Sequence, residues 1–203
     1  MSKLSVIIPC YNHELFIGRC LRSILDQTLD KKLYKVIVID DGSKDNSLKI
    51  IKKFSDNIKI IKNKKNMGLP YSVNLGIKNA KSNYIVRLDS DDYVNKNFLY
   101  FLLEFIEGNK ELTDAVSCDY LVVNDNEKVI KRENCLKNPI ACGIIFKTAH
   151  LIDLGLYNEN LRINEEVELR KRYEKKYKIS RLNLPLYRYR RHQTNITNKF
   201  KKK

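Results

Sequence analysis

The first half of the chain alternates short β-branched runs with amphipathic stretches, and this order constrains the fold more than any other feature. Residues 4–8 are apolar almost throughout, as expected for a strand that is covered on both faces, and further strands are expected at 36–39, 58–61 and 84–88. Apolar residues recur at helical spacing between and after them, in 13–27, 45–54, 70–80 and 98–106. The pattern predicts an α/β fold with a mostly parallel sheet. Pro9 should end the first strand, because proline has no N–H to donate.

The pattern changes beyond residue 117. Residues 121–123 and 129–130 flank a polar turn and predict a hairpin. A further strand is expected at 142–146 and a helix at 164–177, whereas the Tyr- and Arg-rich stretch 182–198 is expected to be irregular. No repeat and no long Gly/Ser/Pro linker is present. We therefore expect residues 1–117 and 118–203 to pack as one domain, the second part being a smaller mixed lobe.

Composition excludes several classes of protein. The 203 residues are 43% hydrophobic, enough for the core of one domain. The longest nearly apolar run, 98–106, is far shorter than the roughly 20 residues of a membrane-spanning helix, and no signal-peptide pattern is present. Five cysteines without a C-x-x-C pair argue against a disulfide framework or a zinc site and suggest buried thiols. We expect a cytoplasmic protein.

The formal net charge of +15 is unevenly distributed. From residue 170 onward there are 14 Lys or Arg and one acidic residue, whereas residues 1–169 are nearly balanced. Such a region attracts nucleic acid, anionic lipid headgroups or a phosphorylated substrate. A solvated basic surface with no partner is the alternative interpretation.

Polar residues follow three of the predicted strands: 11–12, 40–41 and 89–92. The carboxyl ends of parallel strands share one edge of the sheet, where ligands bind. Turn and cap preferences explain any one cluster, but several carboxylates on one edge repel unless a cation neutralises them. Asp-x-Asp offers hard oxygen ligands for Mg²⁺ or Mn²⁺. Because neither a Walker loop nor G-x-G-x-x-G is present, we expect phosphate to be bound through a metal.

Four ordered motifs resemble family 2 glycosyltransferases of the GT-A fold. They are Val-Ile-Ile-Pro-Cys-Tyr-Asn at 6–12, Val-Ile-Asp-Asp-Gly-Ser at 38–43, Asn-Met-Gly at 66–68 with Asn-Leu-Gly at 74–76, and Leu-Asp-Ser-Asp-Asp at 88–92. The resemblance extends over about residues 4–196. It implies a Rossmann-like, mostly parallel sheet flanked by helices, with the nucleotide sugar bound by 1–117 and the acceptor by 118–203.

The resemblance also implies roles for individual residues. Asp89 would meet the ribose and diphosphate and share the metal, Mn²⁺ or Mg²⁺, that Asp91 holds. The other donor-binding residues in the first half would be Pro9, Tyr11, Asn12, Asp41, Asn66 and Gly68. Asp92 is either a further site residue or a cap of the next turn.

Glu165 and Glu166 fall where the family often has Glu-Asp, which implies Glu166 as the catalytic base, with Glu165 as the second candidate. Glu in place of Asp moves the carboxylate by about 1.5 Å, and a misplacement of that order can cost roughly 10²-fold in rate. Alternatively, these residues and Glu168 only favour a helix N-terminus electrostatically.

The segment 186–192, followed by Asn195, resembles the family's C-terminal Tyr-Arg-x-His element. It implies that His192 helps to bind metal or diphosphate and that Arg190, or its neighbour Arg191, neutralises leaving-group charge. The two other histidines, His13 and His150, lie in no motif and are expected to be loop and helix-surface residues.

The resulting hypothesis is an inverting transfer of sugar from a UDP- or GDP-sugar to a saccharide or lipid-linked acceptor, in surface polysaccharide or glycoconjugate synthesis. One alternative is a sugar-phosphate nucleotidyltransferase, although its Gly-rich N-terminal signature is absent. Another is a non-enzymatic basic nucleic-acid-binding protein, which the acidic strand edge opposes, so no specific nucleic acid is expected. Residues 199–203 could hold the enzyme at the anionic inner face of a membrane.

Overall fold

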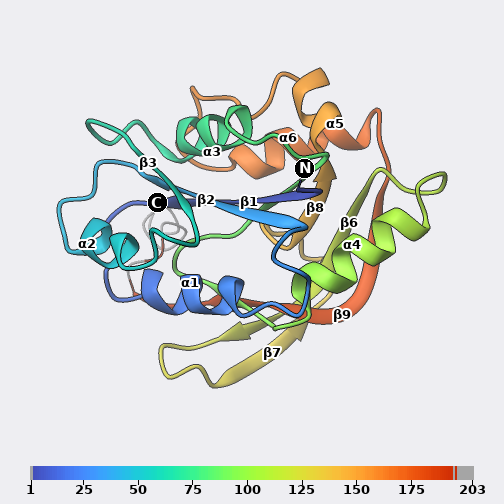
Figure 1. Cartoon of the computed structure of the whole chain (residues 1–203). Coiled ribbons are helices and arrows are strands. Elements are labelled where there is room, and N and C mark those ends of the chain that lie inside the picture. Colours follow the sequence, from blue (N-terminus) through green and yellow to red (C-terminus); the bar gives the residue numbers. More distant parts are fainter. Residues whose placement is uncertain (1, 194, 196–203) are drawn as a thin grey trace, which may run out of the picture.

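Nine strands form one mixed sheet in residues 2–193 and 195, the part of the chain that the computed structural model describes (Figure 1). The order is β3-β2-β1-β4-β8-β6-β9-β5, and β7 pairs with residues 120–123 of β6, beyond the stretch that pairs with β8. The strands are β1 (Leu4–Cys10), β2 (Tyr34–Asp40), β3 (Lys59–Lys62), β4 (Tyr84–Arg87), β5 (Tyr93–Val94), β6 (Ala115–Val123), β7 (Val129–Glu133), β8 (Ile144–Lys147) and β9 (Ile179–Arg190).

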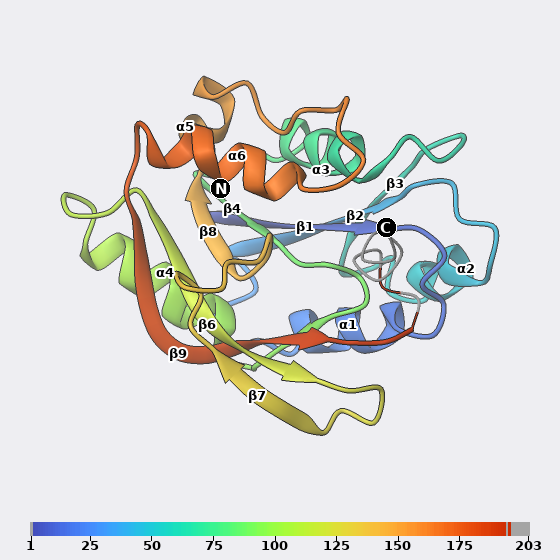
Figure 2. The same cartoon turned by 180° about the vertical axis from the view of Figure 1, so that it is seen from behind.

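Helices cover both faces of the sheet, as Figure 1 and the reverse view in Figure 2 show. They are α1 (Ile17–Leu25), α2 (Ser47–Lys52), α3 (Leu69–Lys78), α4 (Phe98–Gly108), α5 (Thr148–Asp153) and α6 (Glu165–Glu174). Successive strand residues point to opposite faces. Accordingly, Val6 and Ile8 join α1, α2 and α4 in one buried cluster, whereas Ile7 joins α3, α5 and α6 in the other. The α/β prediction is confirmed.

The strands β1 to β4 are parallel, as expected, but β1 does not end at Pro9. It continues to Cys10 alongside β2, whereas its pairing with β4 ends at Ile7. Ile7 accepts a hydrogen bond from Leu88 on the β4 side, and Pro9, two residues on, faces the same side. The prediction was wrong because the missing N–H of Pro9 faces a position where β4 no longer pairs.

The expected irregular stretch contains the longest strand of the described residues, β9. It pairs parallel to β6 and antiparallel to β5. Two register shifts, at Cys118/Asp119 and Asp119/Tyr120, interrupt its pairing with β6. These irregularities break the two-residue alternation by which a strand is recognised, and this explains why the sequence pattern failed here.

Gly76 brings α3 unusually close to the sheet. A Cβ atom at this position would lie 2.4 Å from Cγ2 of Ile7 on β1, closer than two carbons can approach. The glycine of the Asn-Leu-Gly motif is therefore needed for contact between helix and strand.

The hairpin is confirmed as β6–β7, whose turn is closed by a hydrogen bond from Asn124 N to Lys128 O. All five cysteines are buried and free, as expected. The proposed boundary at 117/118 falls inside β6. No helix in the described part is both long and apolar enough to cross a bilayer.

Part of the basic C-terminal region is neutralised within the fold. Arg170 and Arg172 pair with Glu174 and Glu168 on α6, and Arg181 pairs with the buried Asp119. Residues 199–203, the proposed membrane contact, lie outside the described residues.

Candidate functional site

The carboxyl ends of β1, β2, β3 and β4 lead directly into most of the residues predicted for donor binding. Tyr11 and Asn12 follow β1, Asp41 follows β2 and Asp89 follows β4. Parallel pairing places these strand ends on one edge of the sheet. Tyr11 is 38% exposed and remains accessible there.

Asp41 is buried and organises the loop after β3. Its Oδ1 accepts hydrogen bonds from Asn63 Nδ2 at 2.7 Å and from Met67 N at 2.9 Å, and its Oδ2 accepts one from Gly68 N at 2.9 Å. Asp41 therefore fixes the segment that contains Asn66 and Gly68, the other predicted donor residues. A contact between Asp41 and a nucleobase stays a prediction.

Two further contacts join the loops at this edge. Asn12, in the left-handed region with φ of 53°, accepts a hydrogen bond from Lys44 N at 2.8 Å. Gly42, also with positive φ, lies so close to the backbone of Lys65 that a Cβ atom would approach it to 2.6 Å. The loops after β1, β2 and β3 are thus packed into one surface. Pro9 lies beneath it, buried in β1.

Asp91 meets the C-terminal element of the chain. His192 Nε2 lies 3.0 Å from Asp91 Oδ2, and Asn195 Nδ2 lies 3.4 Å from the same oxygen. Burial opposes ionisation of Asp91, but the hydrogen bond from His192 and the charges of His13 and His192 hold its pKa below the ordinary value. The structure thus brings together two of the three predicted metal ligands, Asp91 and His192, whereas the carboxylate of the third, Asp89, pairs with Arg87.

His13 lies at this site although its sequence position indicated only a loop residue. Its Nδ1 is 2.7 Å from Ser90 Oγ, and its ring centroid is 6.4 Å from that of His192. The only sequence signal is that His13 follows the Tyr-Asn pair after β1. His150, by contrast, stacks on Tyr177 with ring centroids 3.8 Å apart on the α5/α6 side.

Asp92 is a buried anchor for β9. It accepts hydrogen bonds of 2.7 Å from the Tyr187 hydroxyl and from Arg190 N. Burial, followed by the charges of Asp91 and Asp89, raises the pKa of Asp92 well above its ordinary value. Asp92 therefore joins the turn after β4 to the last strand.

The Arg190 guanidinium is held inside the fold. Its Nε donates to Asp91 O at 3.0 Å, and its Cζ lies 5.3 Å from the ring centroids of both Phe16 and Tyr93. Glu127 on the hairpin turn pairs with it at 3.5 Å. The hydrogen bond to Asp91 O supports the main chain of the turn at residues 89–92, which contains the predicted metal motif. Phosphate binding by Arg190 stays a prediction and would require the guanidinium to turn.

The two candidate bases have different surroundings. Glu165, at the start of α6, is buried and bonds to Arg87 Nη1 at 3.0 Å. Arg87 also donates to both oxygens of Asp89, at 2.7 and 3.2 Å. Arg87 was not predicted from the sequence, because an arginine at the end of a mostly apolar strand belongs to none of the motifs.

Glu166 lines a cavity of about 370 Å³ between α6, β8 and the segment 136–141. Burial and then the charge of Glu165 raise the pKa of Glu166, whereas Arg87 acts in the opposite direction. Glu168, the third glutamate of the turn, is paired with Arg172. Glu166 is therefore the glutamate with both a cavity before it and a perturbed pKa, as expected of a general base.

The donor set at Asp91 fits a hard divalent cation bound with a substrate. Among the described residues, no three His, Cys, Asp or Glu side chains form a group that could hold a metal ion by themselves. Mg²⁺ is commonly bound by one or two carboxylates together with substrate phosphates and water. Asp91 with His192 fits this arrangement, since the remaining positions would be filled by the substrate.

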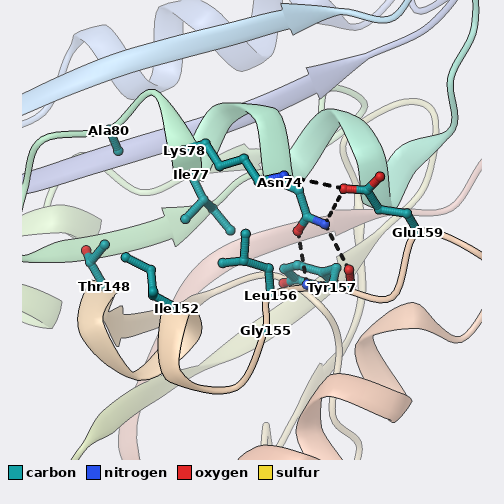
Figure 3. A pocket seen from close by; sticks show the side chains of 10 residues that line it. All are labelled: Asn74, Ile77, Lys78, Ala80, Thr148, Ile152, Gly155, Leu156, Tyr157 and Glu159. Carbon is teal, nitrogen blue, oxygen red and sulfur yellow. Dashed lines mark hydrogen bonds and ion pairs between the residues drawn. The ribbon is translucent and has the colours of Figure 1, made fainter.

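A second cavity, larger than the one that Glu166 lines, lies elsewhere in the described part of the chain. It has a volume of about 520 Å³ and lies between α3, α5 and the segment 155–159, and none of the predicted site residues lines it (Figure 3). Asn74 crosses one side of it, donating to Tyr157 O and to Glu159 Oε1 at 2.8 Å and accepting from Tyr157 N. Because the predicted donor-binding and metal-binding residues do not line this cavity, cavity size does not identify the functional site here.

Comparison with known proteins agrees with this geometry. The profile described as Glycosyl transferase family 2 matches residues 5–141. An uncharacterised glycosyltransferase of Rickettsia conorii is 35% identical over 182 residues, covering 81% of this chain and 29% of that protein. The poly(ribitol-phosphate) beta-N-acetylglucosaminyltransferase TarS of Staphylococcus aureus is 37% identical over 110 residues, covering 53% of this chain and 19% of TarS.

The structural comparisons show a GT-A fold. The crystal structure of TarS 1–349 in complex with UDP-GlcNAc superposes with a TM-score of 0.80 at 27% identity, covering 95% of this chain and 60% of that one. A mannosyltransferase from Pyrobaculum calidifontis in complex with GDP-Man and Mn²⁺ has a TM-score of 0.75 at 15% identity, covering 95% of this chain and 58% of that one, and shows the fold alone. The chain spans less than a third of the length of the two sequence relatives.

Proposed function

The chain belongs to glycosyl transferase family 2, and from that premise we propose that it transfers a sugar from a nucleoside-diphosphate sugar to an acceptor hydroxyl with inversion. The observation that carries the proposal is the contact between Asp91 and His192 at the edge where four parallel strands end. That edge is where an α/β sheet binds nucleotides.

The donor would bind across the loops after β1, β2 and β3. The exposed ring of Tyr11 would contact the nucleoside. Asp41 fixes the loop that contains Asn66 and Gly68, the second proposed wall of the nucleoside site, through hydrogen bonds from Met67 N and Gly68 N. We propose a UDP- or GDP-sugar as donor. The similarity to TarS, whose crystal structure contains UDP-GlcNAc, supports a nucleoside-diphosphate sugar as donor.

Asp91 and His192 would hold Mn²⁺ or Mg²⁺. When bound, the ion neutralises the negative charge that grows on the diphosphate as the sugar bond breaks. The protein itself orients the two ligands, because Asn195 contacts Asp91 and its Oδ1 accepts a hydrogen bond from His192 N at 2.5 Å.

Glu166 would accept the proton of the acceptor hydroxyl as that oxygen attacks the anomeric carbon. A single displacement of this kind inverts the configuration. The raised pKa of Glu166 makes it a stronger proton acceptor than an ordinary glutamate once it is deprotonated. The cavity that Glu166 lines is the proposed entry for a saccharide or lipid-linked acceptor, with surface polysaccharide synthesis as the process.

Thermal unfolding with nucleotides and metal tests the proposal. UDP or GDP should raise Tm only when Mn²⁺ or Mg²⁺ is present, and a screen of nucleotide sugars should then identify one that is hydrolysed in a metal-dependent way. Salt-sensitive binding to any oligonucleotide, without metal-dependent nucleotide binding, would instead support a nucleic-acid-binding protein. Nucleotide transfer onto a sugar phosphate would reveal the nucleotidyltransferase alternative.

We also propose peripheral contact of the basic C-terminal region with anionic membrane at the cytoplasmic face. Binding to vesicles that contain an anionic phospholipid should decrease when residues 199–203 are deleted. Equal binding by the full chain and the shortened chain would remove these residues from the proposal.

A further inference from the structure

Arg87 occupies an unusual position for a charged residue. It is the last residue of β4, a strand between β1 and β8, and its side chain is 4% exposed. The rest of β4 is Tyr84-Ile85-Val86, as expected for a strand covered on both faces. An arginine in this position loses its hydration. Its hydrogen bonds to two carboxylates therefore require an explanation.

The guanidinium is shared between the two sides of the site. Its Nε and Nη2 donate to the two carboxylate oxygens of Asp89, at the start of the metal motif. Its Nη1 donates to Glu165, the first residue of α6 and 78 positions away in the sequence. A planar fork can hold two carboxylates at a fixed separation, which the single ammonium of lysine cannot do.

A third contact restrains the fork. The Tyr157 ring lies with its centroid 5.9 Å from Arg87 Cζ, and Asn74 holds the backbone of Tyr157 through both its N–H and its carbonyl. Arg87 is thus held by β4, by the 155–159 segment and by two ion pairs. Buried ion pairs are weak stabilisers compared with apolar packing. A role in fixing geometry therefore explains the arginine better than a role in stability.

We propose that Arg87 is a positioning residue that fixes Glu166, through its neighbour Glu165, relative to the donor side of the cleft. This inference rests on the proposed function. Glu165 begins α6, so the ion pair with Arg87 sets the first turn from which Glu166 projects. Because Arg87 engages both oxygens of Asp89, that carboxylate is oriented by the same guanidinium, and metal binding falls chiefly to Asp91.

Charged groups on several elements surround Glu166. Glu165 is its neighbour on α6, and Arg87 on β4 acts on its charge. The cavity that Glu166 lines also includes Lys137 and the α6 residues Arg170, Lys171 and Glu174. The rate should fall at low pH as Glu166 becomes protonated. Because Arg87 is a cation and Glu165 an anion, removing the charge of one or of the other should shift the pKa of Glu166, and with it the acid limb of the pH profile of kcat, in opposite directions.

The test compares Arg87→Met with Glu165→Gln, and uses Arg181→Met as a control that removes an ion pair on β9. Arg87→Met should lower kcat by roughly 10²-fold and weaken the binding of UDP or GDP with Mn²⁺ by a much smaller factor. Its acid limb should move to higher pH. Glu165→Gln should also lower kcat but move the limb to lower pH, and Arg181→Met should change neither.

A second measurement does not depend on turnover. Amide hydrogen exchange in the first turn of α6, residues 165–168, should accelerate in Arg87→Met and not in Arg181→Met. Should Arg87→Met fail to fold, Glu165→Gln keeps the shape of the side chain and should give the same local acceleration. Native kcat and unchanged exchange in either variant would overturn the proposal. No metal-dependent turnover in the unaltered protein would count against the proposed function, and the exchange result would still decide the role of Arg87.

Discussion

The imidazole Nε2 of His192 lies 3.0 Å from Asp91 Oδ2, although the two residues are 101 positions apart in the chain. The contact depends on β9, which returns alongside β6 and is fastened to the β4 turn by Asp92. The metal motif and the C-terminal element therefore form one site, and its parts can be tested separately.

Asp91→Ala should abolish metal-dependent nucleotide binding while the fold survives. At a nucleotide concentration 100 times Kd, bound nucleotide stabilises the native state by about 2.7 kcal/mol, and this gain should disappear. Thermal unfolding with and without Mn²⁺ measures it. Asp56→Ala, at an exposed position, is the control. Transfer at the native rate by Asp91→Ala would show that the metal assignment is wrong.

His192→Ala should weaken Mn²⁺ binding without abolishing it, by roughly 10- to 100-fold if His192 acts as a ligand or orients Asp91. Titration of Mn²⁺ in the presence of UDP or GDP gives the apparent Kd. His150→Ala serves as control, because that ring stacks on Tyr177 away from the site. Equal Mn²⁺ affinity in both variants would remove His192 from the metal site.

Glu166→Gln should retain nucleotide binding and lose transfer. In the unaltered enzyme the rate should fall as the pH decreases through the pKa of Glu166, which burial and Glu165 raise above the ordinary value. The same shift favours the protonated form in the folded state, so this group's contribution to stability is greatest at low pH and is lost as the pH rises through the raised pKa. The pH dependence of kcat is the measurement. Full activity in Glu166→Gln would assign the base to Glu165 or Glu168.

Gly76→Ala should destabilise the protein by about 1–3 kcal/mol, since its methyl group would overlap Ile7. Gly108→Ala is the matched control, because a Cβ atom there meets nothing within 4 Å at the end of α4. That variant should be neutral or more stable by about 0.4–1 kcal/mol. Urea denaturation of both variants tests the close approach of α3 to β1. Identical midpoints would contradict it.

Tyr187→Phe should cost about 1–3 kcal/mol of stability, because the buried Asp92 loses a hydrogen-bond partner. The variant should also bind Mn²⁺ with nucleotide more weakly, since β9 carries the chain to His192. Tyr100→Phe, on the surface of α4, should change neither quantity. Weaker stability with unaltered metal affinity would show that Asp92 anchors the strand without supporting the site.

The parallel half of the fold was predictable because apolar residues predominate in its strands and polar residues follow them. The positions of Tyr11, Asp41 and Asp91 at one edge follow from that pattern and from parallel pairing. In contrast, β9 could not be recognised, because its register shifts against β6 remove the alternation.

The contacts of the site that could not be predicted join residues far apart in the sequence. Arg87 donates a hydrogen bond to Glu165, 78 positions away, and Asp92 accepts one from Tyr187, 95 positions away. His13 is explained by Ser90 across the strand edge. A motif shows that a residue is present, but it does not show which distant side chain neutralises or orients it.

The anchoring of β9 to Asp92 has a consequence for the newly made protein. While a ribosome is still translating the first 180 residues, the β1–β4 sheet can form, but the turn after β4 lacks Tyr187, Arg190 and His192. The Asp91 carboxylate is then without His192, and the Asp92 carboxylate is without its partners from β9, whereas Asp89 still has Arg87 on β4. The contact between Asp91 and His192, on which the proposed metal site depends, therefore forms only after β9 has been synthesised.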